Sequence, residues 1–390
     1  MKIVMLVLND MSADARVDRE ALALAEAGHE VTVLALRSGD LPERERRRGY
    51  TVLRVADYTT ASWRDPFAKL RQNQARRRAL LEAGLEEQPE VVHAHDTDTL
   101  AVGALLADLA HVPLVYDAHE LYPDMIAEFG RGGSWPVQTY WKRIERANVP
   151  RAGLVITVSG GLADELRKRF GADPVVVRNV PALEPLADRA RLRDELGMVG
   201  DPRPLFVYQG VLIPGRGLVR LVEAVGQVSD LVLAIQGFGP EETAMRARAE
   251  QLGLADRVRF MGRQPPSELH AYACGADAGV VIYERTTLNN YLAGPNKLYA
   301  YLMAGLPIAA SAFPGLAEVV VDQDVGVTFD PASVDSITSA LRELAGDPVK
   351  RERMGGRARV LAETRYNWDA EKRVLVEAYE QLSASRHAGP

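Results

Sequence analysis

Short apolar runs alternate with amphipathic stretches from the start of the chain. Short, mostly apolar runs bounded by polar residues predict buried strands, whereas apolar residues spaced three and four apart predict helices. Strand-helix alternation of this kind is typical of a mostly parallel, doubly wound sheet. In the first half of the chain, strands are predicted at Ile3–Leu8, Val31–Leu36, Val52–Val55, Val91–His93, Leu114–Tyr116, Leu154–Val158 and Val175–Arg178, with helices at Arg16–Ala27 and at about 67–87, 98–110, 134–150 and 160–170.

The alternation stops at residues 183–203, which are rich in Pro, Arg and Asp and contain no predicted strand. Such a composition indicates a linker. We therefore expect an α/β protein with two Rossmann-like, doubly wound domains, residues 1–182 and 204–365, that face a cleft. A last helical pattern at about 366–383 is long enough to leave the second domain and pack elsewhere. Strands of the second domain are predicted at Leu205–Tyr208, Leu231–Gln236, Val258–Met261, Ala278–Ile282, Ile308–Ala310 and Gly326–Phe329.

The composition is that of a water-soluble globular protein. Hydrophobic residues make up 47% and charged residues 26% of the 390 positions. The single cysteine, Cys274, excludes a disulfide framework and a cysteine-based metal site. No apolar run reaches the roughly 18 residues that a membrane span needs, and the apolar run at the N-terminus is too short for a signal peptide. We expect a cytoplasmic protein.

Charge is unevenly distributed along the chain. The net charge is −6, yet residues 37–78 hold twelve Arg or Lys against five Asp or Glu, which leaves −13 for the rest. One interpretation is a solvated, arginine-rich face. The other is peripheral contact with an anionic membrane, helped by Trp63, Phe67 and Leu70. Nucleic acid is not an expected partner, because the remainder of the chain is acidic.

Ligands of open parallel sheets bind beyond the carboxyl ends of the strands, so polar residues at those ends are candidates. The first such loop holds Asp14, which either caps the next helix or lines the cleft, and Arg16, which could contact a phosphate or the partner domain. The loop lacks G-x-G-x-x-G, so a dinucleotide is not expected. His95, Asp96 and His119 end two later strands and are acceptor-side or catalytic candidates, with structural roles as the alternative.

The H-x-H pair formed by His93 and His95 also suggests zinc, because both rings leave one face of a strand. The sequence offers no third ligand nearby. We therefore expect no metal and no cofactor.

Three glycine-containing strand ends in the second domain are donor-binding candidates, because glycine lets the backbone approach a ligand closely. Gly210 precedes Arg216, whose guanidinium could hold a diphosphate. The other two segments could hold a base through main-chain hydrogen bonds; they are Gly237-Phe238-Gly239 and Gly262-Arg263-Gln264.

The strongest segment runs from Asn289 to Ser311. Gly294 and Pro295 suit the start of a helix. Free N–H groups near Asn296, Lys297 and Leu298, together with the helix dipole and the Lys297 ammonium, predict an anion site. The alternative is an ordinary capped helix with a surface lysine.

Taken together, these segments resemble a GT-B glycosyltransferase, specifically a retaining enzyme of glycosyltransferase family 4. The resemblance covers nearly the whole chain. It rests on the ordered set D-A-R-V-D-R-E-A, A-G-H-E-V-T-V-L, V-Y-D-A-H-E, I-T-V-S-G-G-L-A-D-E-L, G-F-G-P, R-V-R-F-M-G-R, P-N-K-L-Y-A-Y-L-M-A-G-L-P and Y-N-W-D-A-E-K.

The resemblance implies a hexosyl- or N-acetylhexosaminyltransferase of bacterial type. Its donor, UDP- or GDP-linked, would bind mainly to the second domain. The acceptor would be a lipid-linked glycan, a polysaccharide or a small metabolite. By position, Arg216 and Lys297 match residues on the diphosphate, and His119 matches a histidine beside the transferred sugar. The last helix would pack back on the first domain. The implied mechanism lets a β-phosphate oxygen take the acceptor proton, with no divalent ion.

Two departures from the family pattern bear on activity. The E-x7-E pair that many relatives carry would fall at Leu292 and Ala300, and the basic residue after Gly210 is Val211. Loss of a ribose carboxylate would cost about 1.5–3 kcal/mol of donor binding, and Glu284 is the nearest substitute. A catalytically silent homologue that binds nucleotide or glycan is therefore the main alternative. A sugar-nucleotide epimerase on the same fold is a weaker one.

Overall fold

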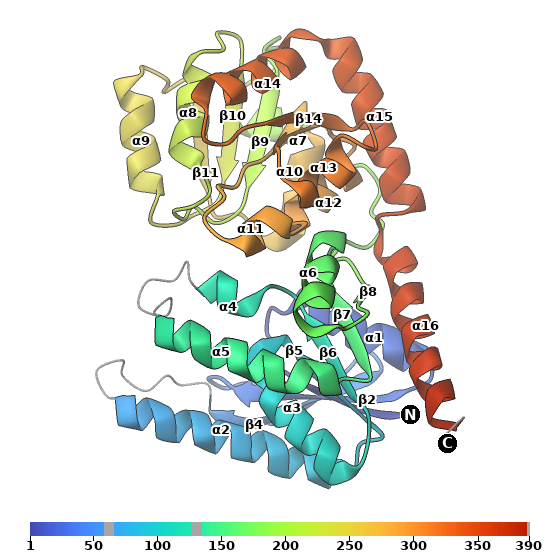
Figure 1. The fold of residues 1–390 in the computed structure, drawn as a ribbon. Helices are drawn as coiled ribbons and strands as arrows, with labels where there is room; N and C mark the ends of the chain where they lie inside the picture. Colours follow the sequence, from blue (N-terminus) through green and yellow to red (C-terminus); the bar gives the residue numbers. More distant parts are fainter. Residues whose placement is uncertain (58–65, 127–134, 388–390) are drawn as a thin grey trace. The chain divides into compact units, whose positions relative to one another are not determined.

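The computed structural model describes residues 1–57, 66–126 and 135–387. The chain forms two compact units, each with its own sheet (Figure 1). The N-terminal unit comprises Met1–Val177 and Lys372–Pro390, and the C-terminal unit comprises Arg178–Glu371. The N-terminal unit is therefore discontinuous in sequence.

The N-terminal sheet has eight strands, and all its neighbouring pairs are parallel except β3–β4. Its central strands β1, β5 and β6 are almost wholly buried, as expected of a parallel sheet covered on both faces. In sheet order the strands are β3 (Arg44–Arg47), β4 (Tyr50–Asp57), β2 (Glu30–Arg37), β1 (Lys2–Leu6), β5 (Val91–His95), β6 (Leu114–Ala118), β7 (Leu154–Thr157) and β8 (Val175–Val176).

Helices cover the N-terminal sheet, and α3 contacts both α2 and α5 (Figure 1). The last helix, α16, starts in the C-terminal unit, but its residues from Lys372 onward belong to the N-terminal unit. There the Tyr379 hydroxyl lies 2.8 Å from Nδ1 of His93, inside the unit. The helices are α1 (Ala15–Glu26), α2 (Pro66–Glu86), α3 (Asp96–Ala110), α4 (Tyr122–Met125), α5 (Trp135–Asn148), α6 (Gly160–Phe170) and α16 (Trp368–His387), with a 3-10 turn, η3 (Val149–Arg151).

The C-terminal sheet is wholly parallel. Successive side chains of a strand point to opposite faces, so Leu205 and Val207 enter one hydrophobic cluster whereas Phe206 and Tyr208 enter the other. In sheet order the strands are β11 (Val258–Gly262), β10 (Val232–Gln236), β9 (Leu205–Gln209), β12 (Ala278–Val281), β13 (Ile308–Ser311) and β14 (Gly326–Phe329).

The helices of the C-terminal unit lie on both faces of its sheet. On one face α8 contacts α9 and α14, and on the other α12 contacts α10 and α15. They are α7 (Ala190–Glu195), α8 (Leu218–Gly226), α9 (Glu242–Gln251), α10 (Leu269–Cys274), α11 (Leu288–Leu292), α12 (Asn296–Met303), α13 (Pro314–Val320), α14 (Val334–Gly346) and α15 (Pro348–Thr364), with a 3-10 turn, η4 (Pro266–Glu268).

Residues 183–203 were expected to form a linker, but in the structure they are part of the C-terminal unit. They carry the short helix α7, whose Leu192 is fully buried in a hydrophobic cluster of that unit. The segment lacks an apolar run because only one face of this short helix meets the core.

The antiparallel edge strand β3 is absent from the predicted elements, since its sequence RERR contains no apolar residue. It is held by polar contacts. The buried Arg54 of β4 donates to Glu45 Oε2 at 2.7 Å and to the carbonyl oxygens of Asp10 and Pro42. A charged edge strand also resists pairing with other chains.

Several arginines of the basic 37–78 stretch are ion-paired within the N-terminal unit. Arg37 pairs with Asp57, and Arg44 pairs with Glu87. Trp63 and the side chains of Phe67 and Leu70, which we expected to help membrane contact, lie outside the described residues. None of the helices in the described part of the chain combines the length and the hydrophobicity that a membrane span requires.

Candidate active site

In the N-terminal unit, the carboxyl ends of β5 and β6 bring together a buried polar network. His95 and Asp117 are register partners on these strands. Arg16 of α1 reaches Asp117 from Nε at 3.0 Å and from Nη2 at 2.9 Å, and it also donates to the carbonyl oxygen of Val177. Burial by itself would raise the pKa of Asp117, but Arg16 and His119 hold that pKa well below its ordinary value.

His119 lies between two carboxylates. Its Nε2 is 2.9 Å from Asp117 Oδ2, its Nδ1 is 3.2 Å from Asp96 Oδ2, and its backbone N–H donates to Asp96 Oδ1. Burial would lower the pKa of His119, but Asp96 and Asp117 outweigh it and hold the pKa well above its ordinary value. The two carboxylates therefore fix the orientation of the ring and favour its protonated form.

The side chains of Asp14 and Arg16 both make hydrogen bonds to other groups of the N-terminal unit. The Asp14 carboxylate accepts from the backbone N–H of Val17 and from the side chain of Asn9, so it caps α1. Arg16 is only 5% exposed. The expectation that it contacts a phosphate or the partner domain is corrected, because Asp117 and the Val177 carbonyl oxygen engage its guanidinium inside the unit.

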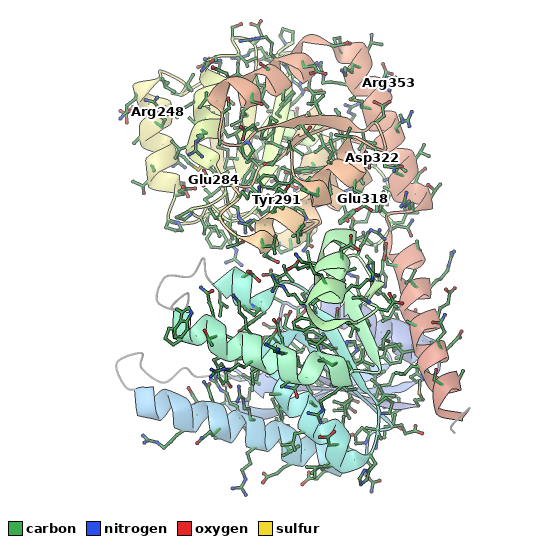
Figure 2. The ribbon with its side chains drawn as sticks, in the orientation of Figure 1. Arg248, Glu284, Tyr291, Glu318, Asp322 and Arg353 are labelled. Atoms are coloured by element: carbon green, nitrogen blue, oxygen red, sulfur yellow. The ribbon has the colours of Figure 1, made fainter. Side chains whose placement is uncertain are left out.

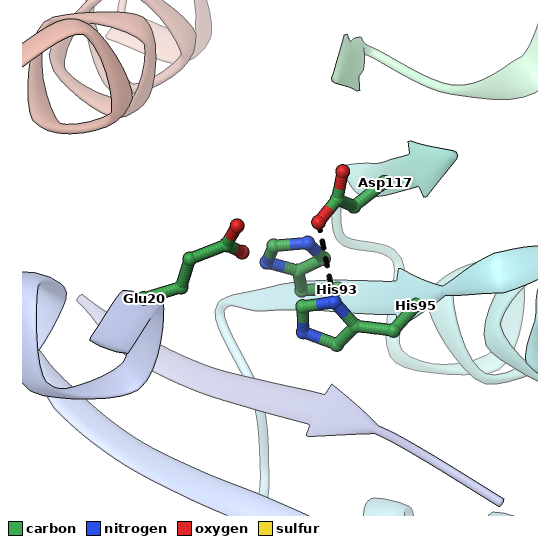
Figure 3. Close-up of side chains that lie close together, drawn as sticks. All are labelled: Glu20, His93, His95 and Asp117. Carbon is green, nitrogen blue, oxygen red and sulfur yellow. Dashed lines mark ion pairs between the residues drawn. The ribbon is translucent and has the colours of Figure 1, made fainter. Parts of the chain in front are cut away.

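A second buried group adjoins His119 and consists of Glu20, His93, His95 and Asp117 (Figure 3). Their potential ligand atoms all lie within 4.8 Å of one another. The H-x-H pair was set aside as a metal site for want of a third ligand, and the structure removes that objection. Glu20 comes from the helix after the first strand, too far away in sequence for spacing to connect it to His93.

In the C-terminal unit, Arg216 and Lys297 form a cationic pair on aromatic rings. The Lys297 ammonium lies 3.9 Å from the centre of the Tyr208 ring, and the Arg216 guanidinium lies 4.0 Å from the centre of the Tyr283 ring. Arg216 also donates to Asn290 Oδ1 at 3.3 Å. Burial, together with the nearby Arg216, holds the pKa of Lys297 well below its ordinary value. Within the described part of the chain, neither cation has a carboxylate ion-pair partner.

Glycine is required at two positions next to this pair. Gly210 has φ +144°, and a side chain there would place its Cβ 2.8 Å from Lys297 Nζ. A Cβ on Gly237 would lie 1.9 Å from the carbonyl oxygen of Gly210. The two strand ends can therefore approach the lysine only because both residues lack a side chain.

The other predicted base-binding residues flank the same strand ends. The backbone N–H of Gly237 donates to the carbonyl oxygen of Gly262. Phe238 is 47% exposed, and Arg263 lies 5.0 Å from the centre of its ring. The Gln264 side-chain amide bonds to the Met261 carbonyl oxygen at 2.7 Å. Gly239 packs against the Leu212 backbone.

The structure contradicts the donor-site prediction at Leu298 and gives the contacts of Glu284. Leu298 is buried in the core, and its backbone N–H bonds to the Pro295 carbonyl oxygen at 2.9 Å, so that N–H is not free for an anion. Glu284, the suggested substitute for the ribose carboxylate, is ion-paired with Arg220; Figure 2 labels Glu284 in the C-terminal unit. Asn296 is exposed at the start of α12, as expected.

Sequence reasoning missed Glu20 and Asp117 as members of the N-terminal network, and Tyr208, Tyr283 and Asn290 beside the cations. Asp117 had a signal, because it lies two residues before His119 and so on the same face of a strand end. Glu20 follows Arg16 by four residues, the spacing of a helical ion pair. Nothing in the sequence marks Tyr208 and Tyr283 as neighbours of the cations, apart from their positions at strand ends.

Two family models match consecutive parts of the chain. Residues 14–181 match the model of glycosyltransferase family 4, and residues 189–361 match the model of the glycosyl transferases group 1. The GDP-mannose-dependent alpha-(1-6)-phosphatidylinositol monomannoside mannosyltransferase of Mycolicibacterium smegmatis is 27% identical over 376 residues, which cover 92% of each chain. A D-inositol 3-phosphate glycosyltransferase of Corynebacterium glutamicum is 28% identical and covers 76% of this chain and 73% of its own.

Solved structures show the same fold. Sucrose-phosphate synthase from Thermosynechococcus elongatus superposes with a TM-score of 0.82 at 20% identity, covering 98% of this chain and 99% of its own. HepE from Anabaena, in complex with UDP and glucose, gives 0.73 at 18% identity and covers 99% and 100%. Two parallel-sheet α/β units, the two consecutive family models and these folds together show that this chain is a GT-B glycosyltransferase and belongs to glycosyltransferase family 4.

Proposed function

We propose that this glycosyltransferase binds the diphosphate of its nucleotide-sugar donor at Arg216 and Lys297 and transfers the sugar with retention of configuration. The observation that carries the proposal is the pair of neighbouring cations for which the described residues supply no carboxylate. Like charges held close together destabilise each other unless an anion joins them. A diphosphate supplies that anion.

The start of α12 adds a second attraction for the diphosphate. Asn296 and Lys297 open this eight-residue helix, whose N-terminal dipole end favours negative charge. A hydrogen bond to a charged group contributes about 1.5–3 kcal/mol, so the loss of one cation should weaken donor binding about tenfold or more.

In the proposed mechanism, Arg216, Lys297 and the start of α12 stabilise the diphosphate as it leaves, which is electrostatic preorganisation. A β-phosphate oxygen accepts the proton of the attacking acceptor hydroxyl. Because these cations take over the charge neutralisation that a metal provides elsewhere, we propose that no divalent ion acts at the diphosphate. We assign to His119 the orientation of the transferred sugar, supported by the two carboxylates that fix its ring.

The names of two similar proteins indicate the class of donor. The mycobacterial relative is named as GDP-mannose-dependent, and HepE was solved with UDP. We therefore propose a UDP- or GDP-linked hexose or N-acetylhexosamine as donor. The proposed acceptor is a lipid-linked glycan, a growing polysaccharide or a small metabolite. The basic 37–78 stretch supports peripheral contact of a cytoplasmic protein with an anionic membrane.

A catalytically silent homologue is the second candidate. Its support is Ala300 on α12, where relatives carry the ribose-binding glutamate, and Leu292 in place of the partner glutamate. The substitute Glu284 is already engaged by Arg220. On this hypothesis the protein binds nucleotide without turnover.

Donor hydrolysis and nucleotide binding separate the two candidates. The purified chain is incubated with UDP- and GDP-linked sugars, and nucleotide release and binding are followed with and without added Mg²⁺. We expect slow release from one donor at a rate that Mg²⁺ does not change. Lys297→Met should weaken nucleotide binding about tenfold or more, whereas Lys350→Met, at a partly buried lysine paired with Glu343 on α14, should not.

Each outcome decides a part of the proposal. Binding without release, even with sugar acceptors present, supports the silent homologue. Equal nucleotide affinities of wild type, Lys297→Met and Lys350→Met refute the diphosphate site. A requirement for Mg²⁺ refutes the metal-independent step.

A further inference from the structure

The buried group of Glu20, His93, His95 and Asp117 contains polar atoms that no protein group satisfies (Figure 3). Glu20 and His93 are 0% exposed, and His95 is 3% exposed. Nε2 of His93, Nε2 of His95 and Oε2 of Glu20 have no hydrogen-bond partner among the described residues, whereas Glu20 Oε1 is ion-paired with Arg16 at 2.9 Å. Each unsatisfied buried polar atom costs about 1–3 kcal/mol. A fold that gathers several such atoms in one place therefore indicates a ligand.

The two histidines are arranged to present their Nε2 atoms together. They alternate on β5, so both side chains leave the same face of the sheet. Their rings are stacked with centres 4.1 Å apart and an interplanar angle of 22°. Figure 3 shows the Glu20 side chain extending from α1 toward both rings.

The contacts on the far side of each ring indicate what the Nε2 atoms offer. His95 Nδ1 lies 3.4 Å from Asp117 Oδ2 and 3.2 Å from His119 Nε2; binding of a metal at Nε2 requires the tautomer in which Nδ1 carries the proton and Asp117 accepts it. His93 Nδ1 lies 2.8 Å from the Tyr379 hydroxyl, which can accept from it in the same way. When Glu20 is ionised, two lone pairs and a carboxylate face one another in these tautomers, and these are all acceptors.

A cation satisfies such a set better than water does, because one water molecule has only two hydrogens to donate. We propose that Glu20, His93 and His95 bind a divalent transition-metal ion of the Zn²⁺ type through the carboxylate and the two Nε2 atoms. Two histidines and one glutamate are a donor set that zinc uses in proteins. Zinc ligands lie about 2.0–2.2 Å from the metal, so the separations of up to 4.8 Å seen here would close by a small inward movement of the side chains.

The groups around the three ligands fit the same interpretation. Metal-bound histidines usually donate their other ring N–H to a carboxylate or similar acceptor, and Asp117 and Tyr379 lie where they can accept from His95 and His93. Arg16 lies 2.9 Å from Glu20 Oε1, which leaves Oε2 for the metal. Arg16 is also ion-paired with Asp117, so one guanidinium contacts two carboxylates in this network.

This metal would act inside the N-terminal unit as a structural ion. It would tie α1 to β5, and through Tyr379 it would also support α16. It is independent of the diphosphate site, which lies in the other unit. The metal site can therefore be tested separately from the proposed transfer reaction.

Metal binding by the full chain tests the inference. The purified protein is stripped with a chelator, and Zn²⁺ is titrated in competition with a chromophoric chelator. We expect one tight equivalent that also raises the Tm. Glu20→Gln and His93→Gln should weaken it at least about 100-fold, beyond what second-sphere changes usually cost. His111→Gln, at an exposed histidine outside the group, should bind Zn²⁺ as the wild type does.

Three results would overturn the inference. The first is that the folded, stripped wild type does not bind Zn²⁺ tightly, and the second is that Glu20→Gln binds Zn²⁺ as tightly as the wild type. The third concerns the infrared band of a protonated carboxyl in the metal-free protein. If Glu20→Gln removes this band, and the band of the wild type persists when Zn²⁺ is added, then Glu20 is not a ligand. If the variants fail to fold by circular dichroism, X-ray absorption at the zinc edge of the wild type decides. Two imidazole ligands support the site, and any other histidine count refutes it.

Discussion

Glu145 should make the stability of the N-terminal unit fall as the pH rises through neutrality. This α5 carboxyl is 2% exposed and accepts a hydrogen bond from Thr97 Oγ1 at 2.9 Å. Burial outweighs that hydrogen bond and raises its pKa from 4.5 to about 7. At about 1.36 kcal/mol per pH unit, this rise corresponds to about 3 kcal/mol.

The sign follows from proton linkage. Between pH 4.5 and about 7 the unfolded chain has released the Glu145 proton while the folded chain still holds it, so stability decreases with pH. The stabilising contribution is complete below pH 4.5 and is lost once the pH passes about 7. Glu145→Gln cannot ionise and keeps an acceptor for Thr97. Its stability relative to wild type should therefore improve by about 2–3 kcal/mol between about pH 5 and about pH 8.

Urea unfolding followed by tryptophan fluorescence measures this difference. Three of the four tryptophans lie within residues 1–177, so the signal reports mainly on the N-terminal unit. The exposed Glu86→Gln of α2 is the control and should leave the pH dependence unchanged. A constant difference between Glu145→Gln and wild type across this pH range would refute the reasoning, because it would mean that Glu145 ionises in the folded state as it does in the unfolded state.

Three further substitutions test other parts of the structure. Gly210→Ala should weaken nucleotide binding about tenfold, measured by calorimetry, because it displaces Lys297 and strains the backbone by about 1–3 kcal/mol. Ala300→Glu should strengthen nucleotide binding about tenfold by restoring a charge-assisted contact; an unchanged affinity would mean that another residue holds the ribose. Tyr379→Phe should lower the free energy of unfolding by about 1–3 kcal/mol, since it leaves Nδ1 of the buried His93 without a partner.

Matched controls separate these effects from general damage. Gly346→Ala introduces a Cβ with nothing within 4 Å and should not change nucleotide binding. If it weakens binding as much as Gly210→Ala does, the steric argument fails. Tyr140→Phe removes a hydroxyl from an exposed ring and should cost less stability than Tyr379→Phe. Equal losses in urea unfolding would contradict the assignment of a buried contact at Tyr379.

Apolar periodicity was enough to place most strands. The run at Ile3–Leu8 corresponds to β1, and the run at Leu231–Gln236 corresponds to β10, because a strand covered on both faces must be apolar throughout. β3 could not be found in this way, since its charged residues are held by contacts with Arg54 and not by burial of apolar side chains. Helix α7 was missed because it is short and only one of its faces meets the core, so its sequence is mostly polar.

The two candidate sites differ in how far the sequence reveals them. The place of Lys297 at the start of a helix could be predicted, because a helix start is a local feature; its binding of an anion stays a prediction. The surroundings of Arg16 could not, since Asp117 lies 101 residues away and only the sheet brings the two together. Leu298 was misjudged because the exact start of a helix decides which backbone N–H groups stay free.

The discontinuous N-terminal unit has a consequence for biosynthesis. Residues 372–387 leave the ribosome only after the whole C-terminal unit has been made. Until α16 arrives, the nascent chain must carry the first sheet without its closing helix and with the partner of His93 missing. The N-terminal unit, although most of it is translated before the C-terminal unit, is thus completed after it. A nascent chain arrested before residue 372 should be a better substrate for chaperones and proteases than the released protein.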